Sequence, residues 1–168
     1  VHFAMEYLAQ SNRRNAGQDI ADGKNILADG KQVVILGGGD TGADCLGTAH
    51  RQEAERIWQL ELLSEPPIGR TETNAWPDWP LIMRTSSAHE EGGERDFDIM
   101  TKAFEGENGR VQRLRAVRLR WENDPQSGRP QAIELPGTEF TIDTDLVLLA
   151  LGFVHGNANS LLGDLGVE

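Results

Sequence analysis

A short apolar run followed at once by glycines is the feature that most constrains what this chain can fold into. Residues 32–36 form a continuous, β-branched run, which is typical of a strand buried on both faces of a parallel sheet. A glycine-rich turn follows, and residues 40–53 are predicted to be a helix. The turn consists of Gly37, Gly38, Gly39, Asp40, Thr41 and Gly42. Such a turn between a buried strand and a helix predicts a site for a dinucleotide phosphate.

Three of these glycines match the Gly-x-Gly-x-x-Gly fingerprint, and each has a separate physical reason. Gly37 permits the tight turn out of the strand, Gly39 lets backbone N–H groups approach a pyrophosphate, and Gly42 allows close helix packing. The helix start offers free N–H groups and the positive end of its dipole. Thr41 adds a hydroxyl donor, and Asp40 is expected to orient the loop. The alternative is a purely structural turn that holds no ligand.

The adenosine half of the coenzyme is expected further along the sheet edge. Glu61 lies 19 residues beyond Gly42, near the end of the second predicted strand, where a carboxylate binds ribose hydroxyls and repels a 2′-phosphate. This position favours NADH, although Glu61 also fits a plain solvent-facing strand residue. Arg51 and Arg70 are the cations that would instead hold the phosphate of NADPH, unless they are ordinary surface arginines. Gly152 is expected near the nicotinamide half, or simply ends a strand.

The remaining pattern predicts an α/β fold with an antiparallel excursion. Residues 1–12 and 40–53 are predicted helices, the first of them followed by a polar connector at 15–30. Residues 64–88, with two Trp-Pro pairs, are expected to be a structured excursion. Predicted strands cover residues 32–36, 56–63, 97–104, 111–122, 130–135, 138–143 and 145–151. The expected class is a Rossmann-type dinucleotide-binding domain, a parallel sheet with helices plus an antiparallel β excursion.

Composition excludes several other classes of function. The chain has 168 residues, with 16 Lys and Arg against 27 Asp and Glu, so we expect one domain that binds neither nucleic acid nor an anionic membrane. The single cysteine, Cys45, excludes a disulfide framework and a cysteine-ligated cluster, and is expected to be a packed small residue. Scattered histidines predict no metal site, and residues 89–91 are expected to be a solvated helix face rather than an acid–base cluster. We expect a cytoplasmic location, without a leader or membrane segment.

Several segments of the chain resemble the small (β) subunit of glutamate synthase. The glycine loop through Asp44 is similar to the second nucleotide-binding segment of that family, and residues 4–8 with 12–14 are similar to its lead-in. Further similar segments are 61–67, 70–71, 76–80, 89–91, 148–153 and 161–167. The paired Trp-Pro segment, residues 76–80, is the most specific part, and the resemblance covers nearly the whole chain.

The resemblance implies a two-dinucleotide flavoprotein in which NAD(P)H binds this domain. In that family hydride passes to FAD in a neighbouring domain, and electrons then cross 4Fe–4S clusters to the large subunit, which converts glutamine and 2-oxoglutarate into two glutamates. Because the cluster cysteines and FAD motifs are not in this sequence, which starts inside a predicted helix, we expect a piece of a longer chain with no flavin and no turnover of its own. Residues 1–30 would be a lead-in from the FAD domain, 31–154 the NAD(P)H-binding domain, and 155–168 the start of the return.

The sequence leaves two questions open, which coenzyme binds and which enzyme is the parent. Family members with Tyr-Arg-Arg after the second strand look built for a 2′-phosphate, whereas this chain has Leu62-Leu63-Ser64, which supports NADH and Glu61 as the ribose ligand. Other members with the same type of segment are assigned NADPH, so both coenzymes stay open. A related flavoprotein, dihydropyrimidine dehydrogenase-like or a ferredoxin-linked transhydrogenase subunit, is the second expectation. A docking module that binds no nucleotide is the third.

Overall fold

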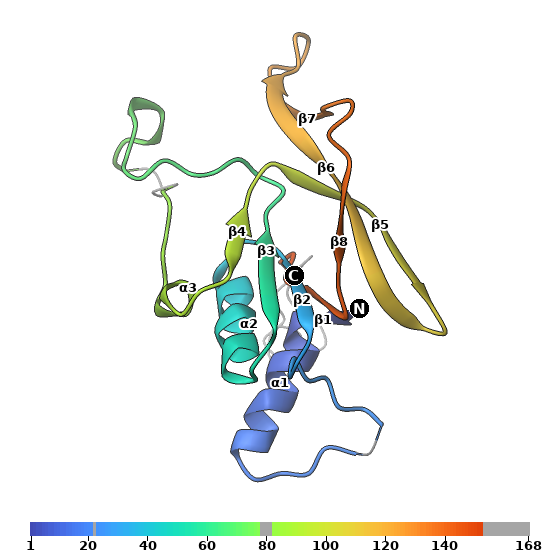
Figure 1. Cartoon of the computed structure of the whole chain (residues 1–168). Coiled ribbons are helices and arrows are strands. Elements are labelled where there is room, and N and C mark those ends of the chain that lie inside the picture. Colours follow the sequence, from blue (N-terminus) through green and yellow to red (C-terminus); the bar gives the residue numbers. More distant parts are fainter. Residues whose placement is uncertain (22, 78–81, 153–168) are drawn as a thin grey trace, which may run out of the picture.

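The computed structural model describes residues 1–21, 23–77 and 82–152, which form two β-sheets with helical segments between the strands (Figure 1). The helical segments are α1 (Ala4–Asn15), α2 (Asp40–Arg51), the 3-10 turn η1 (Glu72–Asn74) and α3 (Ser87–Glu90). The strands are β1 (His2–Phe3), β2 (Gln32–Leu36), β3 (Arg56–Leu60), β4 (Glu94–Asp96), β5 (Ile99–Glu107), β6 (Arg110–Asn123), β7 (Pro130–Glu134), β8 (Phe140–Asp143) and β9 (Leu146–Leu149).

The first sheet is parallel, with the strand order β1-β9-β2-β3-β4. In its centre Ile35 of β2 lies beside Gln59 of β3 on one side and Leu148 of β9 on the other. Helix α2 connects β2 to β3, which is the strand–helix–strand unit that parallel pairing requires. The carboxyl ends of β2, β3 and β9 therefore meet at one edge of the sheet, and the glycine loop leaves β2 at that edge.

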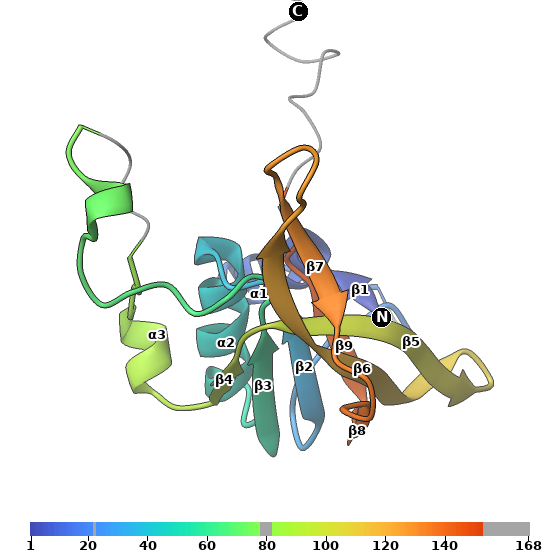
Figure 2. The same ribbon diagram turned by 90° about the horizontal axis from the view of Figure 1, so that it is seen from above.

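Successive side chains of β2 point into two different cores, which explains its continuous apolar sequence. Val33 and Ile35 pack in a cluster with α1 and α2, whereas Val34 and Leu36 pack in a second cluster with the antiparallel strands. The helices thus cover one face of the parallel sheet and the antiparallel strands cover the other, as Figure 2 shows from above. This three-layer arrangement confirms the expected α/β class with an antiparallel excursion.

The second sheet is built around the long strand β6. β6 pairs antiparallel with β5, β7 and β8. Arg118 of β6 donates from Nη1 and Nη2 to the two carboxylate oxygens of Asp96 in β4, at 2.7 and 2.6 Å. The Leu119 N–H also donates to the Asp98 carbonyl at 2.7 Å. These bonds tie the two sheets together near the carboxyl edge of the parallel sheet.

Several predicted boundaries were wrong. Residues 2–3 are a strand paired with β9, so the first helix begins only at Ala4. Residues 94–96 add a parallel strand that the sequence did not suggest, and the strand expected at 97–104 covers Ile99–Glu107 instead. The second helix ends at Arg51 and the strand expected at 138–143 starts at Phe140. The expected segment 155–168 and the second Trp-Pro pair lie outside the described residues.

Two features are absent from the described part of the chain. None of its helices is long and apolar enough to cross a bilayer. In the same residues no three His, Cys, Asp or Glu side chains come together as a metal site would require.

Candidate functional site

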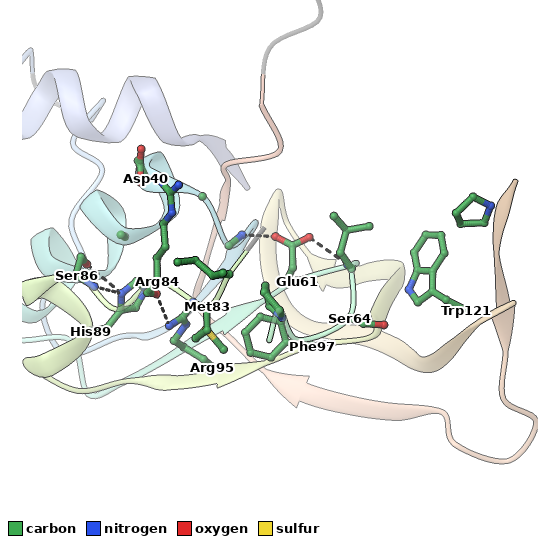
Figure 3. Close-up of a pocket in the computed structure, with 17 residues that line it drawn as sticks. Asp40, Glu61, Ser64, Met83, Arg84, Ser86, His89, Arg95, Phe97 and Trp121 are labelled. Atoms are coloured by element: carbon green, nitrogen blue, oxygen red, sulfur yellow. Dashed lines mark hydrogen bonds between the residues drawn. The ribbon is translucent and has the colours of Figure 1, made fainter. Parts of the chain in front are cut away.

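A cavity of about 580 Å³ opens beside the glycine loop (Figure 3). Its floor is formed by Gly38, Gly39 and Asp40, and the segment after β3 contributes Glu61 and Ser64. Other walls come from α3, from β4 and from Trp121 of β6. A volume of this size is within the range of small-molecule and cofactor sites, about 300–1,000 Å³.

The three fingerprint glycines differ in what surrounds them. At Gly37, which has φ of +120°, an added Cβ would lie 2.2 Å from the Ala150 carbonyl oxygen. At Gly42 it would lie 2.2 Å from the Gly37 carbonyl oxygen and 2.6 Å from Nε2 of Gln59. At Gly39 an added Cβ would meet nothing within 4 Å. The loop is therefore closed against the protein at two glycines and open at the third, which lines the cavity at the start of α2.

One peptide of the loop is held at both ends by side chains of the β3 segment. Gln59 donates from Nε2 to the Gly37 carbonyl oxygen at 2.9 Å. The N–H of the same peptide, on Gly38, donates to Oε2 of Glu61 at 2.5 Å. Residues 59 and 61 are two apart, so their side chains project on the same side of the chain. We call Gln59 and Glu61 the peptide clamp; it leaves the next N–H groups, at the start of α2, for a ligand.

Glu61 uses both carboxylate oxygens in backbone bonds. Besides Gly38, it accepts from the N–H groups of Leu62 at 2.8 Å and Leu63 at 3.2 Å. Its side chain lines the cavity, at the place where a ribose was expected. The ribose role stays a prediction, and the structure adds a second role that the sequence did not suggest, which is to fix the loop.

A histidine from α3 extends the clamp. Ring atom Nε2 of His89 lies 2.9 Å from Oε1 of Gln59, and the Ser86 backbone N–H donates to Nδ1 at 3.0 Å. Gln59 is buried, with 2% of its surface exposed. Burial, with a contribution from Arg95, lowers the pKa of His89. The expectation of a solvated helix face at residues 89–91 was thus wrong for His89, whose side chain turns inward onto β3.

The other expected site residues lie in several places. Asp40 is in the first turn of α2 and lines the cavity, whereas Thr41 and Gly152 line a smaller hollow next to Phe3. Arg51 is at the opposite end of α2, about 16 Å away at 1.5 Å per residue, and its Nη1 lies 3.0 Å from Oε1 of Glu91. The structure therefore does not bring Arg51 to the glycine loop.

Two further expected residues also lie outside the cavity wall. Arg70 donates from Nη1 to the Asn74 carbonyl at 3.1 Å, in the loop that contains η1, and the cavity lining does not include it. Cys45 is a buried residue of the core, and burial raises its pKa to about 12. It is a packed thiol, as expected.

Sequence reasoning missed two cations that the fold brings to the cavity. Arg84 and Arg95 both line it, and Arg95 donates from Nη1 to the Arg84 carbonyl at 3.1 Å. The Arg84 side chain points toward Asp40 in Figure 3. The aromatic rings of Phe97 and Trp121 line the same cavity. In the sequence these two arginines lie on either side of a mostly polar stretch, residues 85–94, and this pattern does not distinguish them from surface arginines.

The solved structures that resemble this chain share its fold at low sequence identity. FprA of Mycobacterium tuberculosis, in a structure with a covalent modification of NADP+, superposes with a TM-score of 0.56 at 13% identity, over 95% of this chain and 46% of that one. FprA in complex with NADPH gives a TM-score of 0.52 over 80% of this chain and 41% of that one. These likenesses confirm the predicted fold class, a Rossmann-type α/β domain with a parallel sheet, helices and an antiparallel excursion. No protein-family model matches the chain.

Relatives found by sequence share a much higher sequence identity with this chain than the solved structures do. A glutamate synthase [NADPH] small chain of M. tuberculosis is 48% identical over all of this chain and 34% of its own length. The small chain of Bacillus subtilis is 35% identical over 35% of its length, and the glutamate synthase [NADH] of Saccharomyces cerevisiae is 38% identical over 8% of its length. The chain thus spans about a third of the small chains that it matches. Over its whole length, this chain is similar in sequence to a segment of glutamate synthase small chains.

Proposed function

We propose that this chain binds NAD(P)H in the cavity beside the glycine loop. The observation that carries the proposal is the contrast between closed and open glycines: Gly37 and Gly42 are packed against the protein, while Gly39 faces open space at the start of α2. A pyrophosphate that lay there would receive the first N–H groups of α2 and the positive end of the helix dipole. The cavity volume of about 580 Å³ fits a dinucleotide of this kind.

NADPH is the coenzyme that the cavity favours. Arg84 and Arg95 line it together with Glu61 and Ser64 of the segment after β3, and arginine recognises phosphate oxygens with paired N–H donors. The relatives of small-chain type with 48% and 35% identity carry NADPH in their names. NADH is the second candidate, because Glu61 lines the same cavity and a carboxylate repels a 2′-phosphate.

Hydride transfer from the bound coenzyme would be its own chemistry, and this chain would supply placement. We propose that residues 31–154 are the NAD(P)H-binding domain of a longer chain, with residues 1–30 and 155–168 leading from and to a flavin domain. The acceptor would be FAD in that domain. In the parent enzyme the electrons would then pass through 4Fe–4S clusters to a large subunit that forms two glutamates from glutamine and 2-oxoglutarate.

Calorimetric titration with NADPH and NADH, side by side, tests the proposal. We expect saturable binding of both, with NADPH tighter. Arg95→Gln should weaken NADPH binding by about ten- to a hundred-fold and leave NADH binding nearly unchanged, since a hydrogen bond to a charged group contributes about 1.5–3 kcal/mol. Arg113→Gln is the matched control, because Arg113 pairs with Asp143 in the second sheet. Tighter NADH would move the assignment to Glu61, and binding of neither coenzyme would contradict the proposal.

A further inference from the structure

The bonds around His89 fix which of its ring nitrogens carries the proton. The Ser86 backbone N–H can only donate, so Nδ1 of His89 must accept, and the proton lies on Nε2. The hydrogen bonds of Gln59 lead to the same protonation state of His89. The Gly37 carbonyl can only accept, so Gln59 presents its Nε2 to it and its Oε1 to His89, which must donate. The two constraints agree on the neutral Nε2–H form.

A continuous hydrogen-bonded relay therefore runs from α3 to the glycine loop. It passes from the Ser86 N–H to His89, from His89 to Gln59, and from Gln59 to the Gly37 carbonyl. Each donor in it has one acceptor, and the Gln59 amide is buried. Without the His89 donor, Oε1 of Gln59 would be a buried acceptor with an unmade bond, and the amide would lose the orientation that holds Gly37.

We propose that His89 and Gln59 are positioning residues which couple the protonation state of one imidazole to the geometry of the glycine loop and so to NADPH affinity. The inference rests on the proposed nucleotide site for its second half. Protonated His89 would present an N–H at Nδ1 to the Ser86 N–H, and two donors facing each other repel. The Ser86 hydroxyl, 3.0 Å from Nδ1, can accept the new proton, so the ring would shift from the Ser86 N–H toward the hydroxyl and the clamp on the Gly37 carbonyl would loosen.

Charged groups of both signs lie on the elements around His89. The neighbouring charged groups are Arg95 of β4, Arg84 before α3, Arg51 and Asp40 of α2, Glu61 after β3, and Glu90 and Glu91 of α3. Arg95 lowers the pKa of His89, after burial. Glu91 is paired with Arg51, and Glu61 is bonded to three backbone N–H groups. The Ser86 hydroxyl lies 3.0 Å from Nδ1 and adds to the same cap.

Two substitutions of His89 separate the relay from simple capping of α3. Gln places an amide nitrogen near the position of Nε2, so His89→Gln keeps the donor to Gln59. Asn places an amide oxygen near the position of Nδ1, so His89→Asn keeps the acceptor for Ser86 and loses the donor. Neither side chain titrates. A capping role predicts that Asn substitutes best, whereas the relay predicts that Gln does.

The test is a calorimetric titration of each chain with NADPH between pH 7.5 and pH 5.5. At pH 7.5 we expect His89→Gln to bind like the wild type and His89→Asn to bind about five-fold more weakly, the effect of one net hydrogen bond. Toward pH 5.5 the wild type should lose more affinity than His89→Gln, by less than about ten-fold because the pKa of His89 lies below 6.5. Because NADPH titrates identically in all three, this difference belongs to the protein. Equal affinities of both variants, or parallel pH profiles, would overturn the proposal.

A second readout does not depend on nucleotide binding. In ¹⁵N-labelled protein, the Gly38 amide belongs to the clamped peptide, so its chemical shift should follow the titration of the His89 ring and stay constant in His89→Gln. A Gly38 shift that ignores His89 would overturn the relay. If the wild type binds no NADPH while the Gly38 shift follows His89, the proposed function fails and the relay within the loop stands.

Discussion

Replacing Gly37 by alanine should destabilise the fold strongly, because two separate effects act at this position. Its φ of +120° is a conformation that side chains rarely adopt, and holding a residue there costs about 1–3 kcal/mol. The added Cβ would also lie 2.2 Å from the carbonyl oxygen of Ala150, a backbone atom directly after β9 that cannot rotate away as a side chain could. Overpacking of this kind costs about 1–3 kcal/mol more. We therefore expect the free energy of unfolding to fall by about 2–6 kcal/mol.

Urea unfolding of the wild type and Gly37→Ala, followed by circular dichroism, measures this loss. The matched control is Gly39→Ala, two residues away in the same loop. Its φ is −81° and an added Cβ meets nothing within 4 Å, so only the weaker helix capping of alanine is lost, about 1 kcal/mol or less. A Gly37→Ala loss below about 1 kcal/mol, or equal losses in the two variants, would refute the packing described for the loop.

Three other outcomes follow from the described contacts. Cys45 should not react with a thiol reagent at pH 8 until the chain unfolds, because the thiol is buried and its pKa is raised to about 12; prompt labelling in native buffer would contradict this. Arg118→Leu and Asp96→Asn should each cost about 1 kcal/mol of stability, a small value because their side chains are 44% and 40% exposed, and a double-mutant cycle should show coupling between them. The pKa of His89 is lowered from 6.5 in the folded state, so the unfolded chain takes up its proton more readily. The contribution of His89 to the free energy of unfolding is therefore complete above pH 6.5 and falls as the pH drops below it. Urea-unfolding series at several pH values should show a smaller fall in His89→Gln.

The strand, glycine loop and helix could be predicted because their signals are local. The run before Gly37 carries the pattern of a doubly buried strand, and the spacing of three glycines fixes where the helix starts. The expectation that Glu61 stands at the edge of the site also came from spacing alone, and the structure places it on the cavity wall. Each of these statements depends on residues within about 30 positions of one another in sequence.

The peptide clamp and its histidine could not be predicted, because they depend on contacts between segments with no regular spacing. Gln59 is a polar residue inside an apolar strand, and only the fold shows that it faces Gly37 on one side and His89 on the other. Glu90 and Glu91 flank His89, so the local sequence indicates a solvated face. The short strand His2–Phe3 was missed for the same reason, since its partner is residues 148–149 at the other end of the chain.

The position of the nucleotide is the central claim, and an NMR titration of the ¹⁵N-labelled chain with NADPH tests it most directly. We predict that the largest amide shifts fall on Gly39, Asp40 and Thr41, at the open side of the loop and the start of α2. A saturable response confined to these amides and to the cavity wall would agree with the account. Shifts that instead gather at the hollow beside α1, around Met5 and Arg13, or no shift at saturating NADPH, would contradict it.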